Sequence, residues 1–145
     1  MITLHYKKAD PKDMDWAYQL FRTVMRQYIA DTWGWDELFQ RHSFEENIPA
    51  SSFTMISHND QDIGGYSLKS EADYLRLEML LIHPDWQRNG VGTAVMEKLF
   101  SASQQQQKVL RLNVLKANPA YNFYLKLGLA IESEDRYRYR MLYTP

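Results

Sequence analysis

The sequence predicts an α/β protein with the element order β-α-α-β-β-β-α-β-α-β-β. Short segments with alternating or continuous apolar residues, typical of strands, are interspersed with segments whose apolar residues recur every three or four positions, typical of helices. The 145 residues are a usual length for one domain, and no linker or internal repeat divides residues 1–145. Apolar residues make up 45% and aromatic residues 14% of the chain, which favours a folded globular core.

The N-terminal third predicts one strand followed by two helices. Ile2–Lys7 alternates apolar and polar residues, as an edge strand does. Asp10-Pro11 opens a helix over about Met14–Ile29, whose apolar residues fall four apart. Thr32 is placed to cap a second helical segment that runs to about Asn47.

The middle of the chain predicts a hairpin followed by a central strand. Ser52–Ser57 and Asp62–Leu68 flank a polar turn. The next strand, Tyr74–Ile82, is almost wholly apolar at its far end, which favours a central position in the sheet. Helical periodicity, an Asn-Pro helix start and a glycine helix end predict the remaining elements. These are a helix over Gly92–Ala102, a strand over Val109–Leu115, a short helix over Ala120–Leu127, and strands over Ile131–Glu134 and Tyr137–Leu142.

The composition argues against several classes of protein. The net charge is −1 and basic residues form no dense patch, so we expect no nucleic-acid partner. Cysteine is absent, and the four histidines share no metal-ligand spacing, so we expect neither disulfides nor a metal. No apolar run reaches the roughly 18 residues of a membrane span, and the N-terminus has no signal-peptide core. We therefore expect a cytoplasmic protein with no membrane partner.

The most informative stretch is Gln87-Arg88-Asn89-Gly90-Val91-Gly92, which lies between a predicted strand and a predicted helix. A tight turn at a helix start can bind phosphate through backbone N–H groups, and the helix dipole assists. Gly90 and Gly92 would let phosphate oxygens approach without interference from a Cβ atom. Arg88 can add a charge-assisted hydrogen bond. The stretch therefore predicts a site for a phosphate-containing ligand.

Two common phosphate motifs fit this stretch badly. A P-loop has lysine before its Ser or Thr, whereas Gly92 precedes Thr93 here. A dinucleotide fingerprint has a third glycine where Val95 stands. A nucleotide-binding protein that uses this loop in another way nevertheless stays an alternative.

A second motif follows the loop, in the segment from Asn118 to Gly128. The loop and this segment together resemble two motifs of the GNAT superfamily of N-acetyltransferases. The first is the family's Gln/Arg-x-x-Gly-x-Gly/Ala pyrophosphate loop. The segment from Asn118 to Gly128 matches the family's second motif at Asn118, Tyr124 and Gly128. Leu129 replaces the phenylalanine that usually follows the glycine. The order of elements is also that of the GNAT fold, so the resemblance covers nearly the whole chain.

The resemblance implies a single GNAT-type domain over residues 1–145, with a mixed sheet and helices on both faces. It also implies acetyl-CoA as co-substrate, with no metal. Asn118 is a candidate hydrogen-bond partner of this cofactor, although Asn-Pro is a good helix start in any protein. The further candidate contacts to the pyrophosphate and pantetheine are Leu80, Leu81, Ile82, Gln87, Arg88, Asn89, Gly90, Val91, Gly92 and Thr93.

The resemblance assigns Tyr124 as the general acid that protonates the leaving thiolate. A phenol is protonated at neutral pH and can donate to sulfur, although Tyr124 can equally be an aromatic that packs on the sheet. Glu78 is the candidate base, because it interrupts an apolar strand and strand alternation places it on the face of Leu80 and Ile82. The alternatives are that Glu78 faces solvent and that water or another acid accepts the proton.

The candidate acceptor-binding residues are Tyr28, Trp33 and Trp35, which lie near Asp36 and Glu37. Aromatic rings together with acids would suit a cationic amine. Both tryptophans can instead be core residues of a small domain. The sequence thus predicts an acetyl-CoA-dependent N-acetyltransferase for a primary amine of a small molecule or protein. The runner-up is a catalytically silent acyl-CoA-binding module, and the acceptor and a homodimer stay open.

Overall fold

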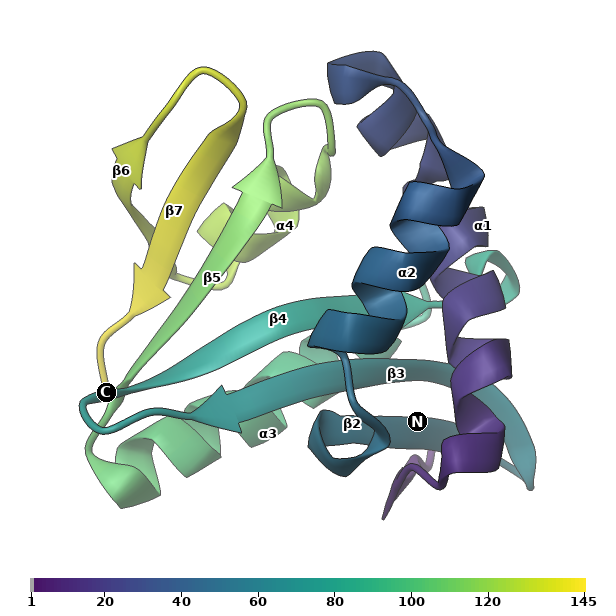
Figure 1. Ribbon diagram of the computed structural model, residues 1–145. Helices are drawn as coiled ribbons and strands as arrows, with labels where there is room; N and C mark the ends of the chain where they lie inside the picture. The colour runs from purple at the N-terminus through teal and green to yellow at the C-terminus, as the bar shows by residue number, and fades with distance from the viewer. Residues whose placement is uncertain (1) are drawn as a thin grey trace.

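The computed structural model describes residues 2–145, which form a seven-stranded sheet flanked by helices (Figure 1). The strand order is β1-β2-β3-β4-β5-β7-β6. The strands are β1 (His5–Lys8), β2 (Phe53–His58), β3 (Gln61–Ser70), β4 (Tyr74–Ile82), β5 (Val109–Leu115), β6 (Ala130–Glu134) and β7 (Arg138–Tyr143). The helices are α1 (Met14–Trp33), α2 (Glu37–Asn47), α3 (Val91–Gln106) and α4 (Ala120–Lys126), with short 3₁₀ turns η1 (Pro11–Asp13), η2 (Ala50–Ser52) and η3 (Pro84–Trp86).

The helices cover both faces of the sheet, and each face has its own apolar core. α3 and α4 bury side chains such as Val95 and Tyr124 against one face. α1 and α2 bury side chains such as Tyr18 and Phe44 against the other. The predicted mixed sheet with helices on both faces is therefore confirmed. Within residues 2–145, no helix combines the length and the apolar character that a membrane crossing needs.

β4 and β5 are parallel neighbours that pair over only part of their length. The paired residues are Tyr74–Leu77 of β4 and Val109–Leu112 of β5. Beyond this point β4 continues to Ile82 along β3, whereas β5 continues to Leu115 along β7. The two strands visibly diverge (Figure 1). We refer to the opening between Met79–Ile82 and Asn113–Leu115 as the wedge.

The pairing of β4 with β3 contains a β-bulge. Leu77 lies opposite Leu68 and Met79 lies opposite Ser67, so that Glu78 is an extra residue with no partner of its own. A bulge interrupts the strict alternation of side chains between the two faces of a strand. The direction of every side chain beyond Glu78 therefore depends on this bulge.

The bulge changes which residues of β4 face which core. Before it, Leu77 packs in the α3–α4 core. After it, Leu80 and Ile82 pack on that core, while Leu81 is buried in the α1–α2 core. Uninterrupted alternation from Leu77 would have placed Leu81 on the α3–α4 side. β4 therefore presents even-numbered residues to the α3–α4 side as it enters the wedge.

The boundary between the first two helices differs from the prediction. Thr32 does not cap α2, because its hydroxyl donates a hydrogen bond to the Tyr28 carbonyl at 2.8 Å inside α1. α1 ends at Gly34, whose φ of 85° leaves the helical region. The cap of α2 is Asp36, whose carboxylate accepts a hydrogen bond from the Phe39 N–H at 3.0 Å. Thr32 was a plausible cap by residue type, but an aspartate four positions later performs that role.

The elements that frame the wedge match their predictions closely. β4 and β5 have the predicted bounds. The hairpin between β2 and β3 turns at Asn59 and Asp60, whose φ angles of 48° and 61° are those of a type I′ turn. α3 begins at Val91 and runs past Ala102 to Gln106.

Candidate functional site

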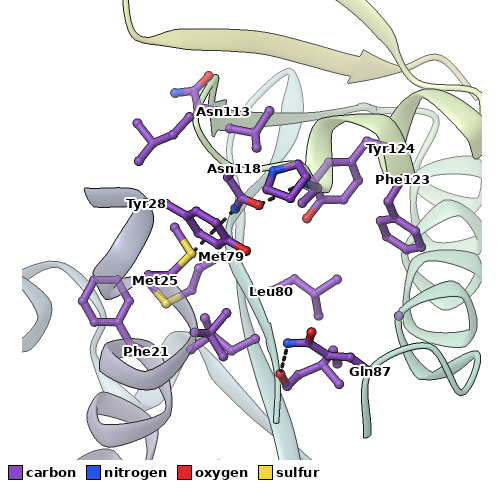
Figure 2. Close-up of a pocket in the computed structure, with 18 of the residues that line it drawn as sticks. Phe21, Met25, Tyr28, Met79, Leu80, Gln87, Asn113, Asn118, Phe123 and Tyr124 are labelled. Atoms are coloured by element: carbon purple, nitrogen blue, oxygen red, sulfur yellow. Dashed lines mark hydrogen bonds between the residues drawn. The ribbon is translucent and has the colours of Figure 1, made fainter. Parts of the chain in front are cut away.

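A cavity of about 700 Å³ occupies the wedge. Its walls come from α1, β4, the loop before α3, the end of β5 and the start of α4 (Figure 2). Its volume lies within the usual range for small-molecule and cofactor sites. Of the predicted site residues, those that line it are Tyr28, Glu78, Leu80, Leu81, Ile82, Gln87, Arg88, Gly90, Gly92, Thr93, Asn118 and Tyr124.

The loop from Gln87 to Gly90 is folded tightly against the end of β4. The Gln87 side chain donates a hydrogen bond to the Ile82 carbonyl at 3.0 Å (Figure 2). Arg88 and Gly90 adopt positive φ angles of 64° and 80°. Val91 is 1% exposed and anchors the first turn of α3 in the core. This arrangement directs the start of α3, and its positive dipole end, into the cavity.

The first N–H groups of α3 are available to a ligand. The first hydrogen bond within the helix runs from the Ala94 N–H to the Gly90 carbonyl. The preceding N–H groups have no acceptor within the helix, as at any helix start. Gly92 and Thr93 line the cavity, whereas Asn89 and Val91 do not. The geometry is that of an anion site built from backbone groups.

Gly92 has a second structural role that the sequence did not reveal. A Cβ atom at this position would lie 3.1 Å from Cζ of Phe123 on α4. At Gly90, by contrast, a Cβ atom would meet nothing within 4 Å, and only the positive φ requires glycine. Gly92 therefore allows α4 to approach the start of α3, which brings Tyr124 towards the phosphate loop.

The exposed edge of β4 offers alternate backbone groups to the wedge. The His83 N–H donates to the Ile63 carbonyl of β3 at 2.8 Å. Because backbone N–H groups of a strand alternate in direction, the Leu81 N–H also points towards β3. The N–H groups of Leu80 and Ile82 consequently point into the wedge, where β5 has diverged. Of the three predicted backbone contacts, Leu80 and Ile82 face the cavity with their polar groups, and Leu81 does not.

Tyr124 lies on α4, with its ring in the core and its hydroxyl at the cavity (Figure 2). Only 8% of the residue is exposed. Burial raises the pKa of Tyr124 to about 12, so the hydroxyl is protonated at neutral pH. The tyrosine thus packs on the sheet, as the alternative reading held, and it also lines the cavity with its hydroxyl protonated.

Asn118 serves as a helix start. Its side-chain oxygen accepts a hydrogen bond from the Ala120 N–H at 2.9 Å, and its amide nitrogen lies 3.8 Å from the sulfur of Met25 on α1 (Figure 2). The residue also lines the cavity. Its oxygen is occupied within α4, so the amide N–H is the group that a ligand can use.

Glu78 lies in the bulge of β4 and lines the cavity. Its carboxylate is 3.4 Å from Nζ of Lys69 and 3.1 Å from Nε of Arg76. The prediction that it shares a face with Leu80 and Ile82 is wrong, because the bulge leaves it beside Arg76 while those two residues pack in the α3–α4 core. The side chain is 22% exposed, which is less than a solvent-facing glutamate shows.

The predicted acceptor residues separate into two groups. Tyr28 points into the cavity from α1, beside Phe21 and Met25 (Figure 2). Trp35 does not line the cavity; its ring lies 6.1 Å from that of Phe21 and packs against the α1–α2 core. Trp33 is 48% exposed and also lies outside the cavity wall. The core reading therefore holds for Trp35.

The two acids of the acceptor prediction are engaged elsewhere. Asp36 caps α2. Glu37 accepts hydrogen bonds from Tyr18, from Arg22 at 2.7 Å and from Trp35 at 3.3 Å. The bond from Tyr18 is the main reason why the pKa of Glu37 is lowered. Neither acid lines the cavity. Within residues 2–145, no three His, Asp or Glu side chains are grouped to hold a metal ion.

Several cavity residues escaped the sequence analysis. Met79 and Asn113 line the wedge from its two strands, and Phe123 lies beside Tyr124 on α4, with ring centroids 5.3 Å apart. Arg138, the first residue of β7, also lines the cavity. No sequence signal marked these positions, because their convergence depends on how β4, β5 and β7 pair.

Most of the chain matches a known protein family. Residues 21–145 match a family model described as "Acetyltransferase (GNAT) domain". The curated "UPF0157 protein YqkA" of Bacillus subtilis (strain 168) is 25% identical over 121 residues, which are 81% of this chain and 35% of that protein. The chain therefore spans about a third of the length of this relative.

Solved structures show the same fold. The PaiA N-acetyltransferase from Thermoplasma acidophilum, in complex with coenzyme A, has a TM-score of 0.81 and 17% identity, and the match covers 99% of this chain and 100% of that one. N-acetylglutamate synthase from Neisseria gonorrhoeae, complexed with coenzyme A and N-acetyl-glutamate, has a TM-score of 0.73 and 16% identity, with 99% and 35% covered. At such identities the likeness concerns the fold alone. Because the family model covers most of the chain, the protein belongs to the GNAT family of acetyltransferases.

Proposed function

We propose that this protein, as one domain, transfers the acetyl group of acetyl-CoA to a primary amine of a small molecule or a protein. The observation that carries the proposal is that three elements of an acyl-transfer site face one cavity. They are the start of α3, the unpaired edge of β4 and the protonated hydroxyl of Tyr124. The family membership supports acetyl transfer in general, and the geometry supports the more specific reaction.

The cofactor would lie along the wedge. Its pyrophosphate would accept hydrogen bonds from the N–H groups of Gly92 and Thr93, with Arg88 at the rim. Its pantetheine amides would pair with the edge of β4 as an added strand does. The thioester oxygen would then accept a hydrogen bond from the Leu80 N–H, which would stabilise the charge that develops on this oxygen.

The reaction proceeds by direct attack of the amine nitrogen on the thioester carbon. A new N–C bond forms and the C–S bond breaks, so the products are the N-acetyl amine and coenzyme A. The thiolate sulfur takes a proton from the Tyr124 hydroxyl. The amine loses one proton to a base, and solvent exchange restores the proton of Tyr124.

We assign the role of base to Glu78, through an ordered water where the amine does not reach the carboxylate. Glu78 is the carboxylate on the cavity wall, and its pairing with Lys69 and Arg76 fixes its position. Asp36 and Glu37, the other acids considered, bind within α2 and to α1 instead. They are therefore poorly placed to accept a proton in the wedge.

The first test is a thermal-shift series with acetyl-CoA, CoA and ATP. A ligand at about one hundred times its Kd stabilises the folded state by about 2.7 kcal/mol. We expect acetyl-CoA and CoA to raise the Tm and ATP to leave it nearly unchanged. A shift with ATP alone would instead support the nucleotide-binding alternative.

The second test separates an enzyme from a silent acyl-CoA-binding module. Release of the CoA thiol is followed while acetyl-CoA is offered with a broad panel of primary amines. Turnover that yields an N-acetyl product by mass spectrometry supports the proposal. Tight acetyl-CoA binding without turnover on any amine would favour the silent module.

A further inference from the structure

The charged side chains on the cavity wall differ in how closely they are paired with groups of opposite charge. Glu78 already has two cationic neighbours, Lys69 at 3.4 Å and Arg76 at 3.1 Å. Arg88 belongs to the phosphate loop, where a pyrophosphate would engage it. The remaining charged group on the wall is Arg138. Its carboxylate neighbour in the described part of the chain, Asp135, lies at 3.8 Å, so Arg138 is the more weakly paired of these charges.

Arg138 lies on the opposite side of the wedge from the phosphate loop. It begins β7 and pairs with Leu115, the last residue of β5. The phosphate loop instead follows Ile82 at the end of β4. β4 and β5 diverge towards these two ends (Figure 1), so Arg138 and the phosphate loop lie on different sides of the wedge.

The guanidinium of Arg138 is held in place but lacks a close acceptor. It lies over the ring of Trp33, 4.7 Å from the centroid. Among the described residues, its carboxylate neighbour is Asp135 at 3.8 Å, which is too long for a hydrogen bond. Asp135 itself accepts the backbone N–H groups of Tyr137 and Arg138, both at 2.8 Å, and Arg140 at 3.1 Å.

Arg138 lines the cavity, its guanidinium lies over an aromatic ring, and its carboxylate neighbour is beyond hydrogen-bond distance. Such a guanidinium is suited to bidentate binding of a carboxylate. Building on the proposed function, we infer that the acceptor is an amine that also carries a carboxylate, and that Arg138 binds this carboxylate. The apolar side chains of Phe21, Met25 and Met79 line the same cavity. They favour an acceptor that carries an apolar group besides its amine and its carboxylate. Free apolar amino acids fit this class.

The inference reverses the expectation of a purely cationic acceptor. Asp36 and Glu37, on which that expectation rested, do not line the cavity. A diamine would place its second positive charge near Arg138, and like charges repel. A carboxylate at the same place gains a charge-assisted pair instead.

The test uses matched trios of amines that differ only in the carboxylate. L-Leucine is compared with L-leucinamide and isoamylamine, and L-phenylalanine with L-phenylalaninamide and phenethylamine. kcat/KM is measured for the parent protein and for Arg138→Gln, Arg138→Lys and the control Arg136→Gln. Arg136 is a neighbouring surface arginine whose guanidinium lies 5.5 Å from the Tyr137 ring and which does not line the cavity.

We expect the carboxylated member of each trio to be the best acceptor. Arg138→Gln should lower its kcat/KM by about 10- to 100-fold, mainly through KM, as loss of a charge-assisted pair does. Arg138→Lys should recover part of this loss, and Arg136→Gln should behave as the parent protein. The amides and the decarboxylated amines should change little in any variant.

Three outcomes would overturn the inference. The carboxylated members are poorer acceptors than their amides, they are not acetylated at all, or Arg138→Gln leaves the ranking unchanged. A loss of CoA affinity in Arg138→Gln, measured by calorimetry, would also overturn it by assigning the arginine to the cofactor. None of these outcomes touches the proposed function, which fails separately if acetyl-CoA does not bind or no amine is acetylated.

Discussion

The end of the cavity beside α3 is made from one short segment, whereas the proposed acceptor end is assembled from distant parts of the chain. Gln87–Thr93 supplies the first through backbone N–H groups, positive φ angles and a helix start. The second takes Tyr28 from α1, Glu78 from the bulge of β4, Asn113 from β5 and Arg138 from β7.

This difference separates what each end recognises. Backbone groups of a contiguous turn bind an anion whatever side chains flank them, so the loop suits a constant cofactor. Side chains from separate elements can be exchanged one at a time without rebuilding a turn. The proposed acceptor end is therefore where specificity could change while the proposed cofactor site stays the same.

Removal of the Tyr124 hydroxyl should have the largest effect, because this hydroxyl is the proposed proton donor to the leaving thiolate. We expect Tyr124→Phe to lower kcat by roughly 10²–10⁴-fold for every acceptor. The ring stays in the core, so the Tm and the CoA Kd should be nearly unchanged. Steady-state kinetics and calorimetry measure these quantities.

The control is Tyr121→Phe on the same helix, because Tyr121 packs on Tyr139 with ring centroids 5.1 Å apart and does not line the cavity. A near-normal kcat in Tyr124→Phe would reduce Tyr124 to a packing residue.

Because burial raises the pKa of Tyr124 to about 12, activity should not fall between pH 7 and about 10 through loss of this proton. The raised pKa contributes stability that is fully present below about pH 10, where unfolded tyrosine begins to ionise, and that is lost as the pH rises towards about 12.

Glu78→Gln tests the base at the acceptor end. We expect kcat/KM to fall about 10²-fold at low pH and less at high pH, because more of the amine is then already deprotonated. CoA affinity should stay constant. The matched control is Glu71→Gln, which removes another partner of Arg76, at 3.0 Å, without touching the cavity wall. A defect of equal size at every pH would indicate a positioning role for Glu78.

Gly90→Val tests the end of the cavity that depends on the backbone. Valine disfavours the φ of 80° by about 1–2 kcal/mol, so the loop should abandon its conformation and the CoA Kd should rise at least about tenfold. All acceptors should be affected alike. Gly34→Val is the control, because Gly34 has a φ of 85° with open space around it and lies outside the cavity. Unchanged CoA affinity in Gly90→Val, measured by calorimetry, would remove the loop from the site.

Trp33→Leu should have the smallest effect, and it tests the proposed acceptor end alone. The ring fixes the Arg138 guanidinium by a cation–π contact worth about 0.5–1 kcal/mol at exposed sites. Its loss should raise KM for carboxylated amines by about two- to fivefold. KM for acetyl-CoA should not change, and kinetics with both substrates varied would reveal the difference. A larger effect on acetyl-CoA than on the amine would contradict this placement.

The same contrast explains how far the sequence could predict the molecule. The bounds of β4 and β5 and the turn before α3 were predictable, because each depends on local apolar patterning or on glycine and helix-start chemistry. The bulge at Glu78 was not, because it is a property of the register between β3 and β4. The position of Arg138 on the cavity wall was equally hidden, since it depends on the pairing of β7 with β5.

The interrupted pairing of β4 with β5 has a consequence for hydrogen exchange. The amides of Leu81 and His83 point towards β3, and the His83 N–H is hydrogen-bonded there, whereas those of Leu80 and Ile82 point into the open wedge. Exchange with deuterated solvent should therefore be slow and fast at alternate residues of one strand. An occupant of the wedge would slow the fast pair and leave the slow pair unaltered. Exchange rates at single residues of β4 would thus report whether the cofactor is bound, even without a conformational change.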